Sequence, residues 1–245
     1  MKRRLDELLM DRGLAETKRE AQALVMAGQV SAEGRRLDKP GLMVDDATAL
    51  HVKAQAPYVS RAGEKLASVA GPLGLDFTRR VVLDVGSSTG GFTDYVLQHG
   101  AARVICVDVG TGQLDYKLRQ DPRVLVMEQT DIRDAQIPEV ADMAVVDVSF
   151  VSLTKVLEAT ARLLEDGSLL VAMAKPQFEA TKAEADRFSG VIPVGAVRNE
   201  ILDRLRGWLR EQFVILGECD SAVAGMRGNV ERFFVLRAKP GNSAQ

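Results

Sequence analysis

Residues 81–92 read VVLDVGSSTGGF, and this stretch decides the fold of the larger part of the chain. A mostly apolar run ends in a glycine-rich turn, and Phe92, Tyr95 and Val96 then follow at helical spacing. A strand, a glycine turn and a helix in this order are typical of the opening unit of a doubly wound α/β sheet. Ser88 stands where the dinucleotide fingerprint G-x-G-x-x-G has its second glycine, so the pattern argues against a nicotinamide-dependent oxidoreductase.

Further strand-like runs follow along the chain, at residues 103–108, 123–127, 141–147, 168–174, 212–217 and 232–236. Helical patterns lie between most of them, for instance at Leu153, Val156, Leu157 and Leu164. This alternation predicts an α/β fold with a mostly parallel, seven-stranded sheet. The connection between the last two runs is too short for a helical crossover. The last strand should therefore be antiparallel and begin at the edge where the parallel strands end.

Acidic residues mark the ends of the first three predicted strands. Asp84 precedes the first glycine of the turn, Asp108 ends the second strand, and Asp131 follows the third. A carboxylate at the place of Asp108 can accept both hydroxyls of a ribose, and Asp131 could meet an adenine amino group. Each acid alone is as well explained by a surface or capping role. The three together favour a nucleotide-like ligand at this edge.

A second group of ionisable residues is predicted at the same edge. Asp147 ends the fourth strand and Lys175 the fifth, and adjacent strands lie ~5 Å apart, so these side chains would be neighbours if the two strands pair. Glu231 precedes the antiparallel last strand and should reach the same place. An exposed charge at a strand end is the alternative interpretation of Glu231.

The first 55 residues have a pattern of their own, with two short helices and a small sheet, close to the lower size limit for an independent core. Thr17 and Glu20 form a predicted capping box at the second helix, and Gly28 ends that helix. Lys18 and Arg19 open the helix, where its dipole and free N–H groups favour phosphate. The basic residues that we assign to nucleic-acid contact, with solvated surface charge as the alternative, are Arg4, Lys18, Arg19, Arg35 and Arg36.

Composition limits the class of protein. The chain has 245 residues, 46% of them hydrophobic, and a net charge of −2, so it should fold but has no global basic signature of nucleic-acid binding. Cys106 and Cys219 lie in apolar stretches and should be buried thiols rather than disulfide or metal ligands. The chain has no signal-peptide pattern and no run of ~20 apolar residues, so we expect a cytoplasmic protein without membrane contact or metal.

Two levels of resemblance follow. Residues 1–55 resemble the S4 RNA-binding domain, and the acid before a glycine turn at 84–91 resembles motif I of class I methyltransferases. The blocks YVSRAGEKL (58–66), LDVGSSTGGFTDYVLQHGA (83–101), VDVGTGQL (107–114), VVDVSFVSL (145–153), AKPQFE (174–179) and GNVERFFVL (228–236) resemble the TlyA (hemolysin A-like) family. The resemblance implies an S4 domain at 1–55, a linker at 56–60, an FtsJ-like, Rossmann-like methyltransferase domain at 61–240 and a tail at 241–245.

The resemblance also implies a reaction, namely methyl transfer from S-adenosylmethionine to a ribose 2′-hydroxyl of ribosomal RNA, typically at cytidine. No Asp/Asn-Pro-Pro-aromatic motif follows the fourth strand, which argues against methylation of a base amine. The family's catalytic tetrad falls on Lys65, Asp147, Lys175 and Glu231, with Lys175 as the candidate base. The cofactor residues fall on Asp84, Gly86, Ser88, Thr89, Gly90, Asp108, Val109, Asp131 and Ile132.

Two alternatives remain at this point. A ribosome-assembly factor could keep the fold without turnover, and a membrane-active hemolysin is suggested by the family's older name. The stretch 180–195 departs from the family pattern, and only Gly190 and Val191 are recognisable there. Target choice therefore follows less directly from the sequence than the type of reaction.

Overall fold

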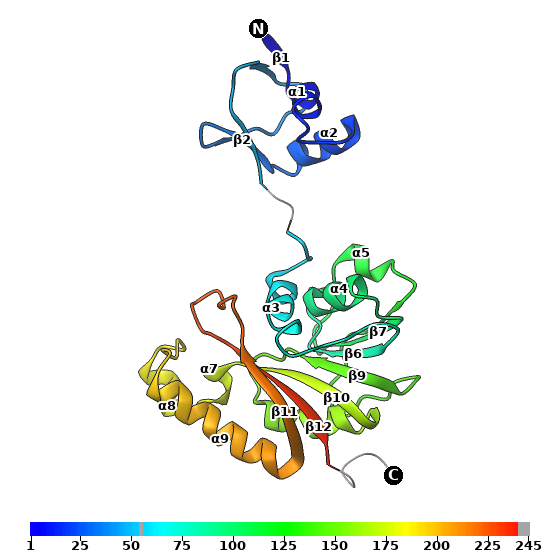
Figure 1. The fold of residues 1–245 in the computed structure, drawn as a ribbon, viewed down its shortest axis with the longest axis vertical. Helices are drawn as coiled ribbons and strands as arrows, with labels where there is room; N and C mark the ends of the chain where they lie inside the picture. The colour runs from blue at the N-terminus through cyan, green and yellow to red at the C-terminus, as the bar shows by residue number, and fades with distance from the viewer. Residues whose placement is uncertain (54–55, 240–245) are drawn as a thin grey trace. The chain divides into compact units, whose positions relative to one another are not determined.

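The computed structural model describes residues 1–53 and 56–239 and divides the chain into two compact units, Met1–Ala56 and Pro57–Gln245 (Figure 1). The expected tail at 241–245 and the residues 54–55 at the end of the expected S4 domain lie outside the described residues. Each unit has its own hydrophobic core, as its own sequence pattern requires.

The first unit contains two helices and two small sheets. A two-stranded antiparallel sheet pairs β1 (Lys2–Arg4) with β4 (Met43–Asp45), and the other sheet has the order β3-β2-β5. The remaining elements are α1 (Leu5–Asp11), α2 (Lys18–Met26), β2 (Val30–Ala32), β3 (Arg35–Arg36) and β5 (Leu50–Val52). The sequence pattern did not predict β1 and β4, because three-residue strands carry too little periodicity to be recognised.

Apolar residues on one face of each helix build the core of this unit, among them Leu5 and Leu9 of α1 and Leu24 and Val25 of α2. The predicted capping box is only half formed. The Thr17 hydroxyl accepts the Glu20 N–H at 3.2 Å, as expected, but the Glu20 carboxylate accepts the Glu16 N–H at 2.8 Å rather than that of Thr17. The carboxylate therefore caps the turn before the helix.

The second unit is a twisted seven-stranded sheet with helices on both faces (Figure 1). The sheet order is β11-β12-β10-β9-β6-β7-β8, and only β12 runs antiparallel to its neighbours, so the predicted Rossmann-like sheet is confirmed. The strands are β6 (Val81–Val85), β7 (Arg103–Val107), β8 (Val124–Met127), β9 (Ala141–Val146), β10 (Leu164–Ala174), β11 (Phe213–Asp220) and β12 (Arg232–Ala238). The helices are α3 (Arg61–Ala70), α4 (Gly91–Gln98), α5 (Tyr116–Arg119), η1 (Leu153–Lys155), α6 (Leu157–Ala161), α7 (Pro176–Glu179), α8 (Lys182–Arg187) and α9 (Ala196–Gln212).

Alternate residues of each central strand enter two cores, one on each face of the sheet. Leu83 and Ile105 pack in one core, and Val104 and Cys106 pack in the other. This is why the strands read as continuous apolar runs. Cys106 is buried as predicted, but the prediction was wrong for Cys219, which lies on an outer strand and is partly exposed.

Two details differ from the predicted pattern. The stretch expected as one helix is divided into η1 and α6, and Leu164 instead begins β10. The early part of β10 pairs with β9 only through Leu164, and regular pairing resumes at Leu169 after a register shift. Leu164 is buried in either arrangement, so its apolar character could not distinguish a helix from a strand.

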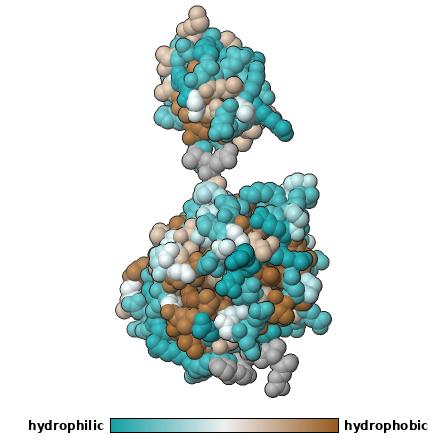
Figure 2. All heavy atoms as spheres, turned by 45° about the vertical axis from the view of Figure 1, so that its right-hand side comes forward, coloured by the Kyte–Doolittle hydropathy of each residue, from teal (hydrophilic) through white to brown (hydrophobic). Residues whose placement is uncertain are grey.

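Hydrophobic residues also reach the surface of the second unit, where they gather in several patches among hydrophilic ones (Figure 2). In the part of the chain that the structure describes, no helix is both long and apolar enough to cross a membrane.

Candidate active site

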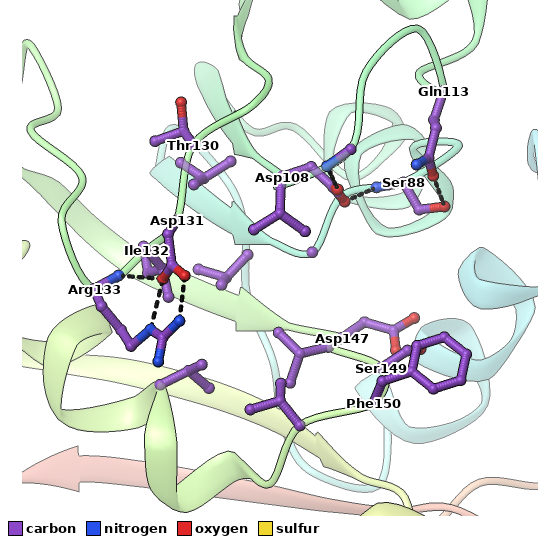
Figure 3. A pocket seen from close by; sticks show the side chains of 18 residues that line it. Ser88, Asp108, Gln113, Thr130, Asp131, Ile132, Arg133, Asp147, Ser149 and Phe150 are labelled. Carbon is purple, nitrogen blue, oxygen red and sulfur yellow. Dashed lines mark hydrogen bonds and ion pairs between the residues drawn. The ribbon is translucent and has the colours of Figure 1, made fainter.

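A cavity with a volume of about 530 Å³ opens at the edge where the parallel strands end (Figure 3). Small-molecule sites typically occupy roughly 300–1,000 Å³, so the cavity suits a ligand of nucleoside size. Among the expected cofactor residues, those that line it are Gly86, Ser88, Asp108, Val109, Asp131 and Ile132. Asp84, Thr89 and Gly90 do not line it, although they belong to the same turn and strand.

The glycine turn forms one wall of the cavity. Glycine is required in this turn because there is no room for a Cβ and because the backbone φ is positive. Gly86 has a φ of +79°, and a Cβ added to it would lie 2.6 Å from the backbone oxygen of Asp147. Gly90 has a φ of +91°, and a Cβ there would lie 2.3 Å from Leu118. The two glycines let the turn fold tightly between β6 and α4.

Asp84 lies behind the turn rather than in the cavity. Its side chain is fully buried, and the Thr93 hydroxyl donates to it at 2.5 Å. Thr93 also lies 3.1 Å from the Cys106 sulfur. Burial raises the pKa of Asp84 to about 7, the Thr93 hydrogen bond acts against this, and the nearby Asp147 adds to it. Asp84 therefore supports the turn from within the protein.

Asp108 is held with both carboxylate oxygens at the cavity. Its Oδ2 accepts the Ser88 N–H at 2.8 Å, and its Oδ1 accepts the Gly110 N–H at 2.7 Å (Figure 3). The Ser88 hydroxyl in turn donates to Gln113 at 3.1 Å. Each carboxylate oxygen keeps further acceptor capacity, so the pair can still accept two hydroxyls of one ribose.

Asp131 also lines the cavity, but its carboxylate is already engaged. The Arg133 Nε donates to Oδ1 at 2.9 Å, the Arg133 Nη2 donates to Oδ2 at 2.5 Å, and the Arg133 backbone N–H donates to Oδ1 (Figure 3). These hydrogen bonds from Arg133 lower the pKa of Asp131 to about 2. An adenine amino group at this carboxylate would share it with the arginine. Sequence reasoning missed Arg133.

The first ion pair at this edge joins Lys175 and Asp147. Lys175 Nζ lies 2.6 Å from Asp147 Oδ1 and donates to the Ser149 hydroxyl at 2.7 Å. The two side chains are only 12% and 16% exposed, and Asp147 lines the cavity. The strands β9 and β10 pair in parallel as predicted, which brings the two residues together.

The second ion pair joins Lys65 and Glu231. Lys65 Nζ lies 2.8 Å from Glu231 Oε1, and the side chains are 12% and 3% exposed. Arg232 of β12 pairs with Ala174 of the antiparallel β10. The next residues along the two chains, Glu231 and Lys175, therefore lie opposite one another just beyond the last pair. Gly225 covers Glu231, since a Cβ on this glycine would lie 2.7 Å from Glu231 Oε1. The four tetrad residues are thus placed as two ion pairs on one edge of the sheet.

Phe150 projects from the loop beside the first ion pair. It is 91% exposed, lines the cavity, and has a φ of +64°, which is uncommon for a residue with a side chain. Its ring lies 5.1 Å from that of Phe178, and Lys175 Nζ lies 5.9 Å from the Phe178 ring. Sequence reasoning missed Phe150 as a site residue, although it comes only three residues after Asp147.

In the first unit, the expected RNA-contact residues lie at the surface. Arg4 forms an ion pair with Asp6 at 2.8 Å, and Lys18 lies 3.7 Å from Glu7. No ion pair involves the other three within the described part of the chain, and all three are exposed: Arg19, Arg35 and Arg36. The described residues also contain no cluster of His, Cys, Asp and Glu that could hold a metal ion.

Comparison with known proteins assigns both units. Residues 3–48 match the S4 domain, and residues 58–239 match the FtsJ-like methyltransferase family. Together with the sheet order and the glycine turn, these matches define a Rossmann-like methyltransferase that carries an S4 domain.

Individual relatives narrow the class of methyltransferase. The chain is 41% identical to a candidate rRNA methyltransferase, YqxC, of Bacillus subtilis, over 94% of this chain and 84% of the relative. It is 37% identical to the 16S/23S rRNA (cytidine-2′-O)-methyltransferase TlyA of Mycobacterium tuberculosis, over 96% of this chain and 90% of that protein. A solved structure of a candidate hemolysin from Streptococcus thermophilus is 38% identical, with a TM-score of 0.73 over 100% of this chain and 91% of the other. The chain belongs to the TlyA (hemolysin A-like) family of FtsJ-like methyltransferases.

Proposed function

We propose that this protein transfers a methyl group from S-adenosylmethionine to a ribose 2′-hydroxyl of ribosomal RNA, at cytidine. A relative with 37% identity over 96% of the chain is named as a 16S/23S rRNA (cytidine-2′-O)-methyltransferase. A substrate of this kind would place the protein in the cytoplasm. The observation that carries the proposal is the presence of two lysine–carboxylate ion pairs at the sheet edge where the cavity opens, one of them through the cavity residue Asp147.

The residues of the cavity fit S-adenosylmethionine by their chemistry. Asp108 offers two carboxylate oxygens to ribose hydroxyls, Val109 and Ile132 supply apolar walls for a purine, and the turn at Gly86 leaves space for the methionine part. When bound, this cofactor supplies a methyl group on a positively charged sulfur. Asp147 lines the cavity, so a methyl group held there would lie next to the first ion pair.

A ribose hydroxyl is a poor nucleophile until its proton is removed or shared. We assign Lys175 as the group that takes this proton, because it is the lysine that contacts both the cavity residue Asp147 and the exposed loop at Ser149. To take the proton Lys175 must be a neutral amine; Asp147 orients its nitrogen and stabilises the ammonium that forms, while Glu231 orients the Lys65 ammonium. Buried ion pairs contribute little net stability, so their main effect is to fix these groups in place before substrate arrives.

The target nucleotide and the RNA around it would be held by two other features. The exposed Phe150 ring next to the ion pair offers a stacking surface for a base. In the S4 unit, exposed Arg19, Arg35 and Arg36 would contact phosphates, joined by Arg4 and Lys18 once their surface ion pairs exchange for phosphate.

The test is methyl transfer from methyl-labelled S-adenosylmethionine to purified ribosomal subunits, followed by alkaline hydrolysis of the RNA. A 2′-O-methyl group blocks hydrolysis at its own nucleotide, so the label should remain in an alkali-resistant dinucleotide that begins with cytidine. Label in an alkali-sensitive nucleotide would indicate base methylation. No incorporation into either subunit, or into free rRNA, would contradict the proposal.

A further inference from the structure

Two segments leave adjacent strands at the active edge and carry the first ion pair. The segment 147–153 follows β9 and carries Asp147, and the segment 175–179 follows β10 and carries Lys175. The two strands pair side by side up to Val146 and Ala172, but beyond them no sheet hydrogen bonds hold the segments together. The geometry of the ion pair therefore depends on other contacts between the segments.

One set of contacts lies at the cavity side. The Lys175 ammonium donates to the Ser149 hydroxyl at 2.7 Å, and the rings of Phe150 and Phe178 lie 5.1 Å apart. Phe150 is 91% exposed, so this ring pair is weakly confined by the protein. Asp147, at the start of the segment 147–153, is also held by its backbone N–H, which donates to the Val85 oxygen at 2.9 Å.

A second contact is made by Glu179, the last residue of α7 and of the block AKPQFE. Its Oε2 accepts the Ser152 hydroxyl at 2.5 Å, and its Oε1 accepts the Leu153 N–H at 2.8 Å. Both donors belong to the start of η1, which the Ser152 hydroxyl also caps through the Thr154 N–H. The two carboxylate oxygens of Glu179 thus hold the segment 147–153 at its far end, at Ser152 and Leu153.

Glu179 has no ion-pair partner among the described residues. Burial raises its pKa, and the hydrogen bonds from Leu153 and Ser152 act in the opposite direction. Glu179 is only partly buried, and a partly buried acid without an ion-pair partner still costs stability unless its hydrogen bonds compensate. Its presence here is better explained by what it holds than by any gain in stability.

We propose that Glu179 is a positioning residue for methyl transfer, which ties residues 152–153 to α7 and so holds Ser149 and Phe150 beside Lys175. Phe150 has a backbone φ of +64°, a conformation that persists only where the surroundings enforce it. Glu179 fixes the loop two residues beyond Phe150 and supplies that constraint. This inference rests on the proposed methyl transfer, because it concerns how the target ribose and base are placed.

The experiment measures kcat, the KM for RNA and the cofactor Kd for four variants with ribosomal RNA as substrate. Glu179→Ala should lower kcat about tenfold and leave the cofactor Kd within about twofold, because Glu179 does not line the cofactor cavity. Ser152→Ala should lower kcat about threefold, since it removes one of the two hydrogen bonds. The double variant should match Glu179→Ala alone, because both changes break the same link.

Glu179→Gln should recover most of the activity, since the amide oxygen can accept the Leu153 N–H and the Ser152 hydroxyl can turn to accept from the amide. The matched control is Glu184→Ala. Glu184 also accepts hydrogen bonds at a helix start, in a capping box with Thr181 at α8, and it forms an ion pair with Arg204, but it contacts neither segment. This control should keep the wild-type kcat.

Three results would overturn the inference. They are a wild-type kcat in Glu179→Ala, equal losses of kcat and cofactor affinity in that variant, or multiplicative effects of the Ser152 and Glu179 changes. If Glu179→Ala does not fold, an unchanged kcat in Ser152→Ala would overturn the inference by itself. An inactive wild-type protein would instead contradict the proposed function and this inference with it.

Discussion

The two units each bury an aspartate completely, and they treat it in opposite ways. In the S4 unit, Asp6 receives hydrogen bonds from Arg4 at 3.0 and 2.8 Å and from Gln22 at 3.1 Å, and the Arg4 hydrogen bond lowers its pKa to about 2. In the methyltransferase unit, Asp84 is hydrogen-bonded by Thr93 and has no ion-pair partner among the described residues, and burial raises its pKa to about 7. Burial alone therefore does not decide the charge state, and a cation in contact does.

The same difference extends to the basic residues of each unit. Arg4 remains 43% exposed and Lys18 53% exposed, so both can release their partners and meet a phosphate. Lys65 and Lys175 are 12% exposed, and each is fixed by a carboxylate at 2.8 Å or less. The basic residues of the S4 unit are thus exposed and exchangeable, as our proposal of RNA contact requires, whereas those of the methyltransferase unit are mostly buried and fixed, as the proposed chemistry requires.

The largest expected effect comes from removing the side chain that we propose takes the proton. Lys175→Ala should lower kcat by about 10²–10⁴-fold, the range for a group that takes a proton, while the cofactor Kd stays near the wild-type value. Single-turnover methyl transfer and calorimetric cofactor binding would measure the two. Lys239→Ala is the control, because Lys239 follows β12 at the opposite edge of the sheet and donates to backbone oxygens of Arg210 and Glu211. Equal kcat values for the two variants would contradict the assignment.

A smaller effect is expected from crowding the cavity. Gly86→Ala should weaken cofactor binding at least tenfold, because the new Cβ would lie 2.6 Å from the backbone oxygen of Asp147 and the φ is +79°. Gly74→Ala separates the two causes, since Gly74 has a φ of +62° but no atom within 4 Å of an added Cβ. Its cofactor Kd should not change. Loss of binding in both variants would show that backbone strain, rather than crowding, is responsible.

The pH dependence of stability distinguishes the two buried aspartates. Between pH about 4 and 7 the folded protein keeps a proton on Asp84 that the unfolded chain has released, so this group makes stability fall as pH rises through that window. Asp84→Asn removes this titrating group. The free energy of unfolding of the variant should therefore rise relative to that of the wild type as pH rises from about 4 to about 7. Asp6 contributes with the opposite sign, because its folded pKa is lowered, and its contribution is lost as pH falls toward 2.

The measurement is denaturant unfolding of wild type and Asp84→Asn at several pH values. Trp208, the chain's single tryptophan, lies on α9 of the methyltransferase unit and reports on that unit alone. A stability difference that stays constant from pH 4 to pH 8 would mean that Asp84 keeps its charge when folded.

The smallest effects are expected in the S4 unit. Lys18→Ala and Arg19→Ala should each change the free energy of unfolding by less than about 1 kcal/mol, as is usual for exposed charges. Each should also reduce the slope of log affinity against log salt by about 0.7–0.9 in RNA binding, since one phosphate contact is lost. Filter binding to rRNA across salt concentrations would measure this. An unchanged slope in both variants would place the RNA surface elsewhere.

The sheet and its active edge could be predicted from the sequence because buried parallel strands leave continuous apolar runs and end at one edge. The pattern also predicted the antiparallel last strand and hence the approach of Glu231 to Lys175. Lys65 could not be found this way. It lies on a helix 166 residues before its partner Glu231, and only the family resemblance indicated it.

Other features of the site depend on side-chain and backbone conformations that residue types alone do not predict. Arg133 could have been a surface charge, but it folds back on Asp131 two residues away. Thr93 has no pattern that marks it as the partner of Asp84 across the turn. The left-handed backbone at Phe150, whose ring lies 5.1 Å from that of Phe178 on α7, is not predicted by anything in the sequence VSF.

We propose that the residues of the two ion pairs at the sheet edge promote transfer of a methyl group from the cofactor to a ribose of rRNA. Mapping of ribose methylation in cells tests this most directly. Ribose methylation would be mapped across rRNA from cells that lack this protein and from the same cells supplied with wild type or Lys175→Ala. The proposal predicts a 2′-O-methylcytidine that is absent without the protein, restored by wild type and absent again with Lys175→Ala. Identical maps in all three strains, or a site restored fully by Lys175→Ala, would contradict it.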